Sequence, residues 1–125
     1  MSKDAKSIEV LWDDQQHINS FNKLNARMHE IEAMIRVKKA VLTDYEDASN
    51  ELMLSDEETV RYAVGECLIH MDKGEAEEKL NAESQGVEAE VRGFQSQVVD
   101  IKEQLNQLKA QLYGKFGKSI NLEED

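Results

Sequence analysis

Apolar residues recur along most of this chain with a period of seven, in two long stretches that flank a short segment with a different pattern. The first stretch covers residues 13–54 and is interrupted at Lys38 and Ser49, and the second covers residues 72–116. A sustained seven-residue period predicts long helices that pack along a coiled-coil seam. The first helix would be roughly 60 Å long, which is more typical of a coiled coil than of a globular domain. The main seam residues are Phe21, Leu24, Met28, Ile31, Ile35, Leu42, Tyr45 and Leu52 in the first stretch, and Leu80, Val87, Val91, Phe94, Val98, Ile101, Leu105, Leu108 and Leu112 in the second.

Residues 59–71, TVRYAVGECLIHM, are the only segment with the chemistry of β-strands. Apolar and other residues alternate from Val60 to Val64, which is the period of two expected of a pleated strand. Gly65 allows the backbone to turn with a positive φ, and Cys67–Met71 is a second apolar and β-branched run. The segment therefore predicts a β-hairpin with its turn around Val64–Glu66. A lone hairpin is marginal in water because its outer edges keep unpaired N–H and C=O groups, so we expect it to need partners.

Local signals mark the ends of the two predicted helices. Asp13 and Gln16 have the spacing of a capping box, which predicts a helix start near residue 13. Asp72 offers an N-cap for the second helix. The acidic segment Ser55–Glu58 breaks the apolar pattern and predicts the connection that leads into the hairpin. Gly114 and Gly117, which bracket Lys115 and Phe116, predict that the second helix ends near residue 116.

Two amphipathic helices joined through a hairpin can bury their apolar stripes by folding back on one another. The predicted fold is therefore mainly α: an antiparallel two-helix coiled coil with a β-hairpin at the helix–helix connection, and both chain ends at the opposite tip. Residues 1–125 would form a single domain, with a short acidic tail at residues 117–125. Burying a large apolar side chain contributes about 1.5–3 kcal/mol, whereas ordering a residue costs about 1–2 kcal/mol, so this thin core predicts further chains.

The net charge of −11 over 125 residues narrows the range of partners that the chain can have. Nucleic acid and anionic membrane surfaces attract clustered Lys and Arg, so we expect neither as a partner. The single cysteine, Cys67, cannot form an internal disulfide, which fits a reducing compartment. No apolar run has the length of a signal-peptide core or of a membrane span. Together these features predict a cytoplasmic protein.

No motif in the sequence indicates a catalytic, cofactor or metal site. Phosphate-binding glycine loops and paired Cys and His ligands at metal spacing are missing. His17 and His29 are twelve residues apart on the first predicted helix, which turns their side chains about 120° from one another. Cys67 has no activating base in its local sequence, and a buried free cysteine behaves as a small hydrophobe. We therefore expect a protein that is not an enzyme and that uses no cofactor and no metal ion.

Apolar residues also gather near both predicted chain ends. They are Trp12, Ile18, Phe21, Leu112, Tyr113, Phe116, Ile120 and Leu122. Such residues either close the end of the coiled coil or form an exposed patch that holds another protein. Closure is the favoured interpretation for Phe21 and Leu112, which lie at seam positions. Both interpretations stay open for the residues outside the strict seam, which include Trp12, Tyr113, Phe116 and Ile120.

Three motifs carry a resemblance to a known family. Residues 12–21 (WDDQQHINSF), 62–70 (YAVGECLIH) and 112–123 (LYGKFGKSINLE) resemble the corresponding stretches of beta-class prefoldin subunits. The order helix, hairpin, helix at these lengths is also the plan of that class, which carries one hairpin where the alpha class carries two. Gly86 and Gly93 depart from what the family leads us to expect. Each costs about 1 kcal/mol relative to Ala inside a helix, which predicts a softer segment there.

The resemblance implies an ATP-independent co-chaperone of the cytosol. Prefoldin is a heterohexamer, so the implied partners are two alpha-class and three further beta-class subunits. Their hairpins join into a β-barrel, while the coiled-coil tips hold non-native actin and tubulin and pass them to the cytosolic chaperonin. The hairpin residues implied in subunit assembly are Val60, Tyr62, Val64, Leu68, Ile69 and Met71. The eight apolar residues near the chain ends are the implied client-binding residues.

The alternative to a chaperone subunit is a coiled-coil assembly or tethering protein without chaperone activity. A tether would need the seam and the hairpin, but it would not need loose aromatic and aliphatic residues at the tip. The state of these tip residues therefore distinguishes the two hypotheses.

Overall fold

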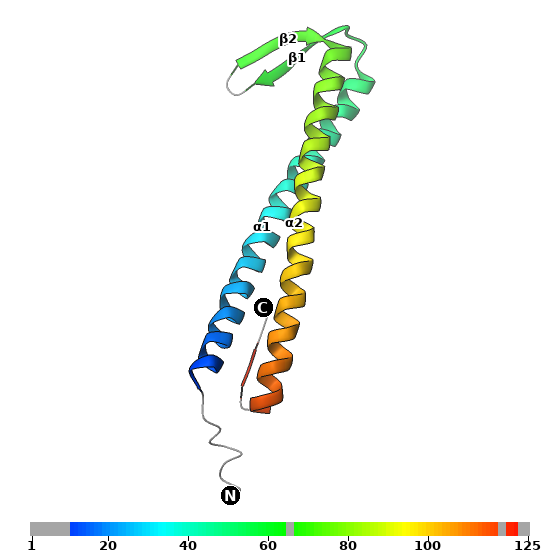
Figure 1. Ribbon diagram of the computed structural model, residues 1–125. Coiled ribbons are helices and arrows are strands. Elements are labelled where there is room, and N and C mark those ends of the chain that lie inside the picture. The colour runs from blue at the N-terminus through cyan, green and yellow to red at the C-terminus, as the bar shows by residue number, and fades with distance from the viewer. Residues whose placement is uncertain (1–10, 65–66, 118–119, 123–125) are drawn as a thin grey trace, which may run out of the picture. The chain divides into compact units, whose positions relative to one another are not determined.

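The computed structural model describes residues 11–64, 67–117 and 120–122 (Figure 1). The elements follow one another as α1 (Trp12–Leu54), β1 (Thr59–Val64), β2 (Cys67–Asp72) and α2 (Lys73–Phe116). The predicted fold class is confirmed, because two long helices flank a two-stranded antiparallel hairpin. The element bounds differ from the predicted ones by one residue, at the start of α1 and at the junction of β2 with α2.

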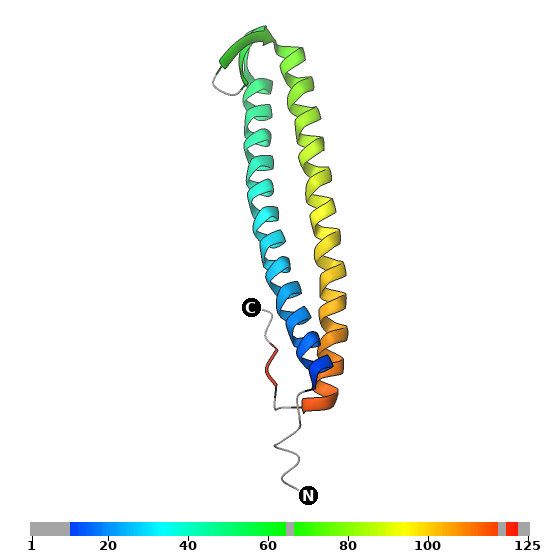
Figure 2. The same ribbon diagram turned by 60° about the vertical axis from the view of Figure 1, so that its left-hand side comes forward.

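The chain divides into two compact units. The hairpin unit, residues 34–94, contains the end of α1, both strands and the start of α2. The terminal unit, built from residues up to 33 and from 95 onwards, contains the start of α1, the end of α2 and the tail. Within each unit, a segment of α1 lies beside an antiparallel segment of α2 (Figures 1 and 2).

The core of the terminal unit follows the predicted seven-residue period. Phe21 and Met28 of α1 are buried one period apart, and Val98, Leu105 and Leu112 of α2 are buried at the same interval. Each of these side chains contributes about 1.5–3 kcal/mol by leaving water. The seam assigned from the sequence is therefore the core of this unit.

The core of the hairpin unit is thinner. The described residues that are buried there are Ala76, Leu80 and Val91. Seam residues such as Leu42 and Leu52 stay half-buried. Lys38, which interrupts the apolar seam, forms an ion pair in the folded chain. Its amino group lies 2.8 Å from a carboxylate oxygen of Glu90 on the facing helix. A partly exposed pair of this kind fixes the register of two helices more than it stabilises them.

A backbone contact explains why α1 begins one residue before its predicted start. The carboxylate of Asp14 accepts the backbone N–H of Leu11 at 3.0 Å, and the N–H of Gln15 donates to the Leu11 carbonyl. Leu11 is therefore the residue at the cap position, and Asp13 lies inside the first turn of α1 rather than at the cap expected for it.

Both ends of α2 follow the predicted signals. The carboxylate of Asp72 accepts the backbone N–H of Gly74 at 3.1 Å, so Asp72 caps the start of the helix. At the other end, α2 stops at Phe116 and Gly117 follows with a φ of +57°. Only glycine adopts this left-handed conformation without a steric cost, which is why the helix ends here.

Candidate functional site

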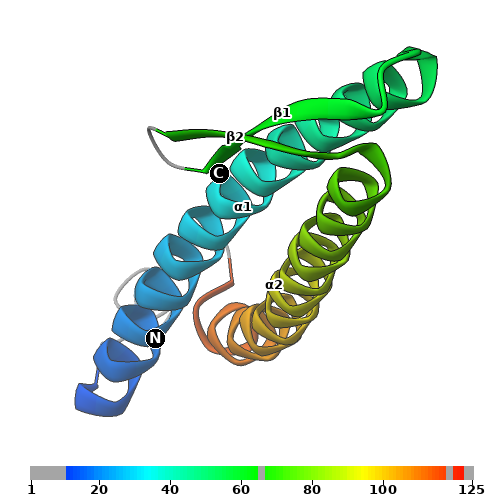
Figure 3. The same cartoon turned by 90° about the horizontal axis from the view of Figure 1, so that it is seen from above.

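The register of the hairpin places most of the predicted assembly residues in one row. Figure 3 shows the two strands side by side, and in the chain they follow the end of α1 and lead into the start of α2. Val60 pairs with Met71 and Tyr62 pairs with Ile69, and directly paired residues share a face of a sheet. This apolar row therefore lies on one face. The described pairs of the opposite row include Arg61 with His70 and Thr59 with Asp72.

The two remaining assembly candidates lie next to the turn. Val64 pairs with Cys67 and continues the register of the apolar row. Leu68 pairs with Ala63 and so belongs to the opposite row. The predicted turn around Gly65 falls on residues that lie outside the described part of the chain.

The hairpin keeps outer edges without a strand neighbour in the described part of the lone chain. In the part of the chain that the structure describes, the sheet consists of β1 and β2 alone, so each strand has an outer edge that faces no other strand. Ile69 in the apolar row is 45% exposed, while Val60, Tyr62 and Met71 are half-buried. Another strand added at either edge would pair the backbone groups of that edge and could cover the row.

A carboxylate connects the hairpin to both helices. Glu83 of α2 forms hydrogen bonds with Tyr62 of β1 and with Tyr45 of α1. Burial is the main cause that raises the pKa of Tyr62 to about 12, and the hydrogen bond to Glu83 adds to it. The pKa of Tyr45 is also raised, first by burial and then by the negative charge of Glu83. A phenol with the ordinary tyrosine pKa of 10.0 is already protonated at neutral pH, so both phenols donate to the carboxylate, which ties β1 to the helices.

Tyr45, Tyr62 and Glu83 line a hollow of about 550 Å³ in the hairpin unit. Leu52 of α1, Val60 of β1 and Leu80 of α2 contribute apolar groups to its wall, and Glu51 and Arg61 contribute charges. Well-packed interiors contain few voids larger than a water molecule. The hollow is partly open to solvent, so the apolar groups in its wall are incompletely covered in the lone chain.

The base of the hairpin carries an apolar pair that sequence reasoning missed. The N–H of Lys73 donates to the Glu58 carbonyl at 2.8 Å, and its Nζ donates to the Ser55 carbonyl at 2.9 Å. Just before this closed base, α1 ends with Met53 and Leu54, which are 73% and 85% exposed. Two large apolar side chains so exposed in one helical turn are typical of a contact surface. Their only signal in the sequence is that both lie outside the seam.

The structure separates the eight apolar residues near the chain ends. The buried ones are Phe21, Leu112, Phe116 and Leu122. The half-buried ones are Ile18 and Ile120. Trp12 is 74% exposed, and Tyr113 is exposed as well. In the lone chain the four buried side chains close the end of the terminal unit, so the apolar surface there is formed mainly by the others.

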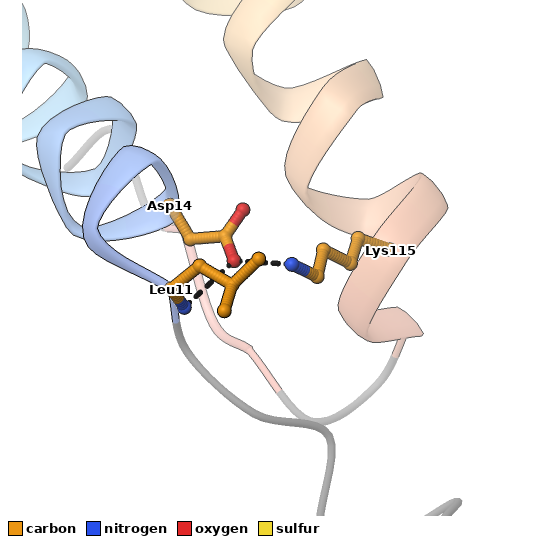
Figure 4. A network of polar contacts seen from close by, with 3 residues as sticks. All are labelled: Leu11, Asp14 and Lys115. Carbon is orange, nitrogen blue, oxygen red and sulfur yellow. Dashed lines mark hydrogen bonds and ion pairs between the residues drawn. The ribbon is translucent and has the colours of Figure 1, made fainter.

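An ion pair between Asp14 of α1 and Lys115 of α2 joins the helices beside these residues (Figure 4). The Oδ2 atom of Asp14 accepts hydrogen bonds from the Nζ of Lys115 and from the backbone N–H of Leu11. The bond from Lys115, and then that from Leu11, holds the pKa of Asp14 below its ordinary value. The Lys115 amino group also lies 5.5 Å from the ring centre of Phe116, within cation–π range.

The described residues contain no candidate metal site, because no three of their His, Cys, Asp and Glu side chains are grouped so that they could hold an ion. His17 and His29 both lie on α1. In the same part of the chain, no helix combines the length and the apolar character that a bilayer crossing requires.

Sequence comparison relates the chain to prefoldin subunits. The family model for prefoldin subunits matches residues 15–119. Prefoldin subunit 4 of Homo sapiens is 37% identical over 123 residues, which cover 97% of this chain and 92% of the human protein. Prefoldin subunit 4 of Saccharomyces cerevisiae is 34% identical over 116 residues, which cover 92% of this chain and 90% of the yeast protein.

A solved structure has the same fold. The crystal structure of the prefoldin beta subunit from Thermococcus strain KS-1 matches with a TM-score of 0.79, covering 87% of this chain and 96% of the archaeal one. The identity of that pair is 16%, so this match concerns the fold alone. Together with the sequence relatives, it confirms the resemblance that the three motifs indicated. The chain therefore belongs to the prefoldin family of chaperone subunits.

Proposed function

We propose that the chain is a beta-class subunit of a cytoplasmic, heterohexameric prefoldin that binds non-native proteins without ATP. Its partners would be two alpha-class and three further beta-class subunits. Its clients would be non-native actin and tubulin, which the complex delivers to the cytosolic chaperonin. Family membership supports the chaperone role. The observation that carries the proposal is the described two-stranded sheet, whose outer edges face no other strand and whose apolar row leaves Ile69 exposed in the lone chain.

The hairpin has the properties of an assembly element. Each backbone hydrogen bond that a neighbouring strand supplies contributes about 0.5–1.5 kcal/mol net, and a row of such bonds adds up along an edge. Covering the exposed side of Ile69 adds apolar burial. Met53 and Leu54 offer further apolar surface at the end of α1 in the same unit. The subunit interface that we propose therefore combines both strands with the last turn of α1.

Client binding in this proposal falls to the apolar residues of the terminal unit. An unfolded chain presents apolar segments in no fixed geometry, so a permissive apolar surface suits it better than a shaped pocket. Trp12 supplies the largest exposed side chain of this surface. The net charge of −11 opposes self-association of such a surface and favours clients that carry basic residues.

Ile69→Asp tests the assembly role, and His70→Asp is its matched control. The two residues are neighbours on β2, but the register puts them in opposite rows of the hairpin. A charge buried at a subunit interface without a partner is costly, so we expect Ile69→Asp to be excluded from the reconstituted complex while His70→Asp enters it. Native mass spectrometry measures incorporation, and circular dichroism confirms that both variants keep their helices. Equal incorporation of the two variants would show that the apolar row is not part of the subunit interface.

The alternative function, a coiled-coil assembly or tethering protein without chaperone activity, uses the same hairpin. Only client capture separates the two. We expect complexes in which the exposed residues Trp12 and Tyr113 are both replaced by Ser to assemble and to suppress client aggregation less well. The loss would be partial because the other subunits still bind. Unchanged suppression across several clients would assign these residues to end closure alone.

A further inference from the structure

Three residues of the C-terminal tail, Ile120–Leu122, lie in the described part of the chain. Beyond Gly117, the described segment Ile120–Leu122 lies beside the ends of the helices (Figures 1 and 2). Leu122 is only 6% exposed and Ile120 is half-buried, whereas Asn121 between them is exposed. Side chains that alternate between interior and solvent are those of an extended segment. Ile120–Leu122 is therefore an extended segment whose first and third side chains face the terminal unit.

A hydroxyl group on α2 binds the backbone of this segment. The N–H of Leu122 donates to the Tyr113 hydroxyl at 3.1 Å, and the same hydroxyl lies 3.5 Å from the Leu122 carbonyl oxygen. A hydrogen bond to the backbone makes no demand on the side chain, whereas the burial of Leu122 demands an aliphatic group. The two contacts together suit any extended segment with an aliphatic residue at this position.

Leu122 is buried and Ile120 is half-buried, so both aliphatic side chains pack against the terminal unit. We call the surface that they cover the tail seat, and Tyr113 of α2 adds its hydroxyl to it. If Ile120–Leu122 left, the area that these two aliphatic side chains now cover would face water. Apolar surface that is exposed in this way captures apolar segments of other chains.

We propose that the tail seat is a binding site for extended client segments in which two aliphatic residues flank a third residue, and that Ile120–Leu122 occupies this site until a client displaces it. The inference rests on the proposed client-binding function and names the class of client segment. A tethered segment competes at a high effective concentration, so the tail lowers the apparent affinity of the site. Weakening the tail therefore tightens client binding, whereas loss of a residue that contacts the client directly would weaken it.

The test uses the reconstituted complex that contains the full-length chain, with a labelled synthetic peptide SINLEED, which copies residues 119–125. The variant is Leu122→Ser, which removes the buried side chain of the tail and leaves the seat intact. Val99→Ser is the matched control, because Val99 is an exposed aliphatic residue on α2 in the same unit. A peptide with Ser in place of its leucine controls for specificity, and fluorescence anisotropy measures the dissociation constants.

We expect Leu122→Ser to bind SINLEED about tenfold more tightly than the wild type, because a buried aliphatic side chain changes a binding constant by about that factor. Val99→Ser should match the wild type, and the serine-containing peptide should bind neither variant measurably. Adding Tyr113→Phe to Leu122→Ser should weaken peptide binding about threefold or more, because the backbone of the peptide loses its hydroxyl partner.

Unchanged or weaker peptide binding by Leu122→Ser would overturn the inference. Equal binding of the serine-containing peptide and of SINLEED would also overturn the inference. Peptide binding requires no chaperone activity, so its outcome is separate from that of the proposed function. A complex that binds the peptide at the seat and yet never suppresses client aggregation would refute the proposed function and leave the seat in place.

Discussion

Replacing Gly86 and Gly93 by Ala should stiffen the part of α2 that lies in the hairpin unit. Both glycines are exposed inside α2, and a Cβ added at either position would meet nothing within 4 Å. No packing cost opposes the gain in helix propensity, which is about 1 kcal/mol for each Gly→Ala change. The two changes together stabilise the helix against local opening by about 2 kcal/mol, which slows amide exchange there by about thirtyfold.

Hydrogen–deuterium exchange of the reconstituted complex measures this effect, and Gly117→Ala is the matched control. A Cβ at Gly117 would also meet nothing within 4 Å, but its φ of +57° is strained for alanine. That strain costs about 1–2 kcal/mol, so the same substitution should speed exchange in the last turn of α2. Unchanged or faster exchange around residues 86–94 in the double variant would refute the reasoning, because low helix propensity would then not be what softens α2.

The lone chain should self-associate or unfold without a sharp transition, because its hairpin edges lack partners; a stable, cooperatively melting monomer in analytical ultracentrifugation and thermal melts would contradict this. Met53→Ser combined with Leu54→Ser should weaken incorporation into the complex by on the order of tenfold or more, whereas Val37→Ser, which changes another exposed aliphatic residue of α1, should not. Equal effects in native mass spectrometry would exclude the apolar pair from the interface. The Asp14–Lys115 ion pair should stabilise the chain above the ordinary aspartate pKa of 3.8 and lose this effect as the pH falls through the lowered pKa of the folded state. Asp14→Asn should therefore reduce the melting temperature of the complex at neutral pH, and the difference from the wild type should shrink in acid; a difference that is independent of pH would argue against the ion pair.

The helices and the hairpin could be predicted because their signals are local and periodic. The seven-residue period put Phe21 and Leu112 in the seam, and both are buried. The alternation in residues 59–71 predicted a hairpin that the structure confirms with an offset of one residue. The helix caps were predicted correctly at both ends of α2 but not at the start of α1. Asp72 and Gly117 act as expected, whereas α1 begins at Trp12 because a backbone contact of Asp14 decides its start.

Contacts between distant parts of the chain could not be predicted. Asp14 and Lys115 are 101 positions apart, and nothing in their local sequences distinguishes them from the other charged residues. The hydrogen bonds of Glu83 to two tyrosines depend on how three elements meet. The burial of Leu122 depends on the return of the tail, while its surrounding sequence is polar and acidic. The roles of the hairpin residues in assembly and of the apolar residues near the chain ends in client binding stay predictions.

Aggregation of denatured actin, followed by light scattering in the absence of nucleotide, tests most directly whether this chain completes a complex that holds non-native proteins. The comparison is between the five partner subunits alone and the same subunits reconstituted with this chain, with assembly confirmed by native mass spectrometry. We expect the complete complex to suppress aggregation strongly and the incomplete mixture to suppress it weakly. A fully assembled complex that leaves the aggregation of actin unchanged would contradict the proposed chaperone function and favour the tethering alternative.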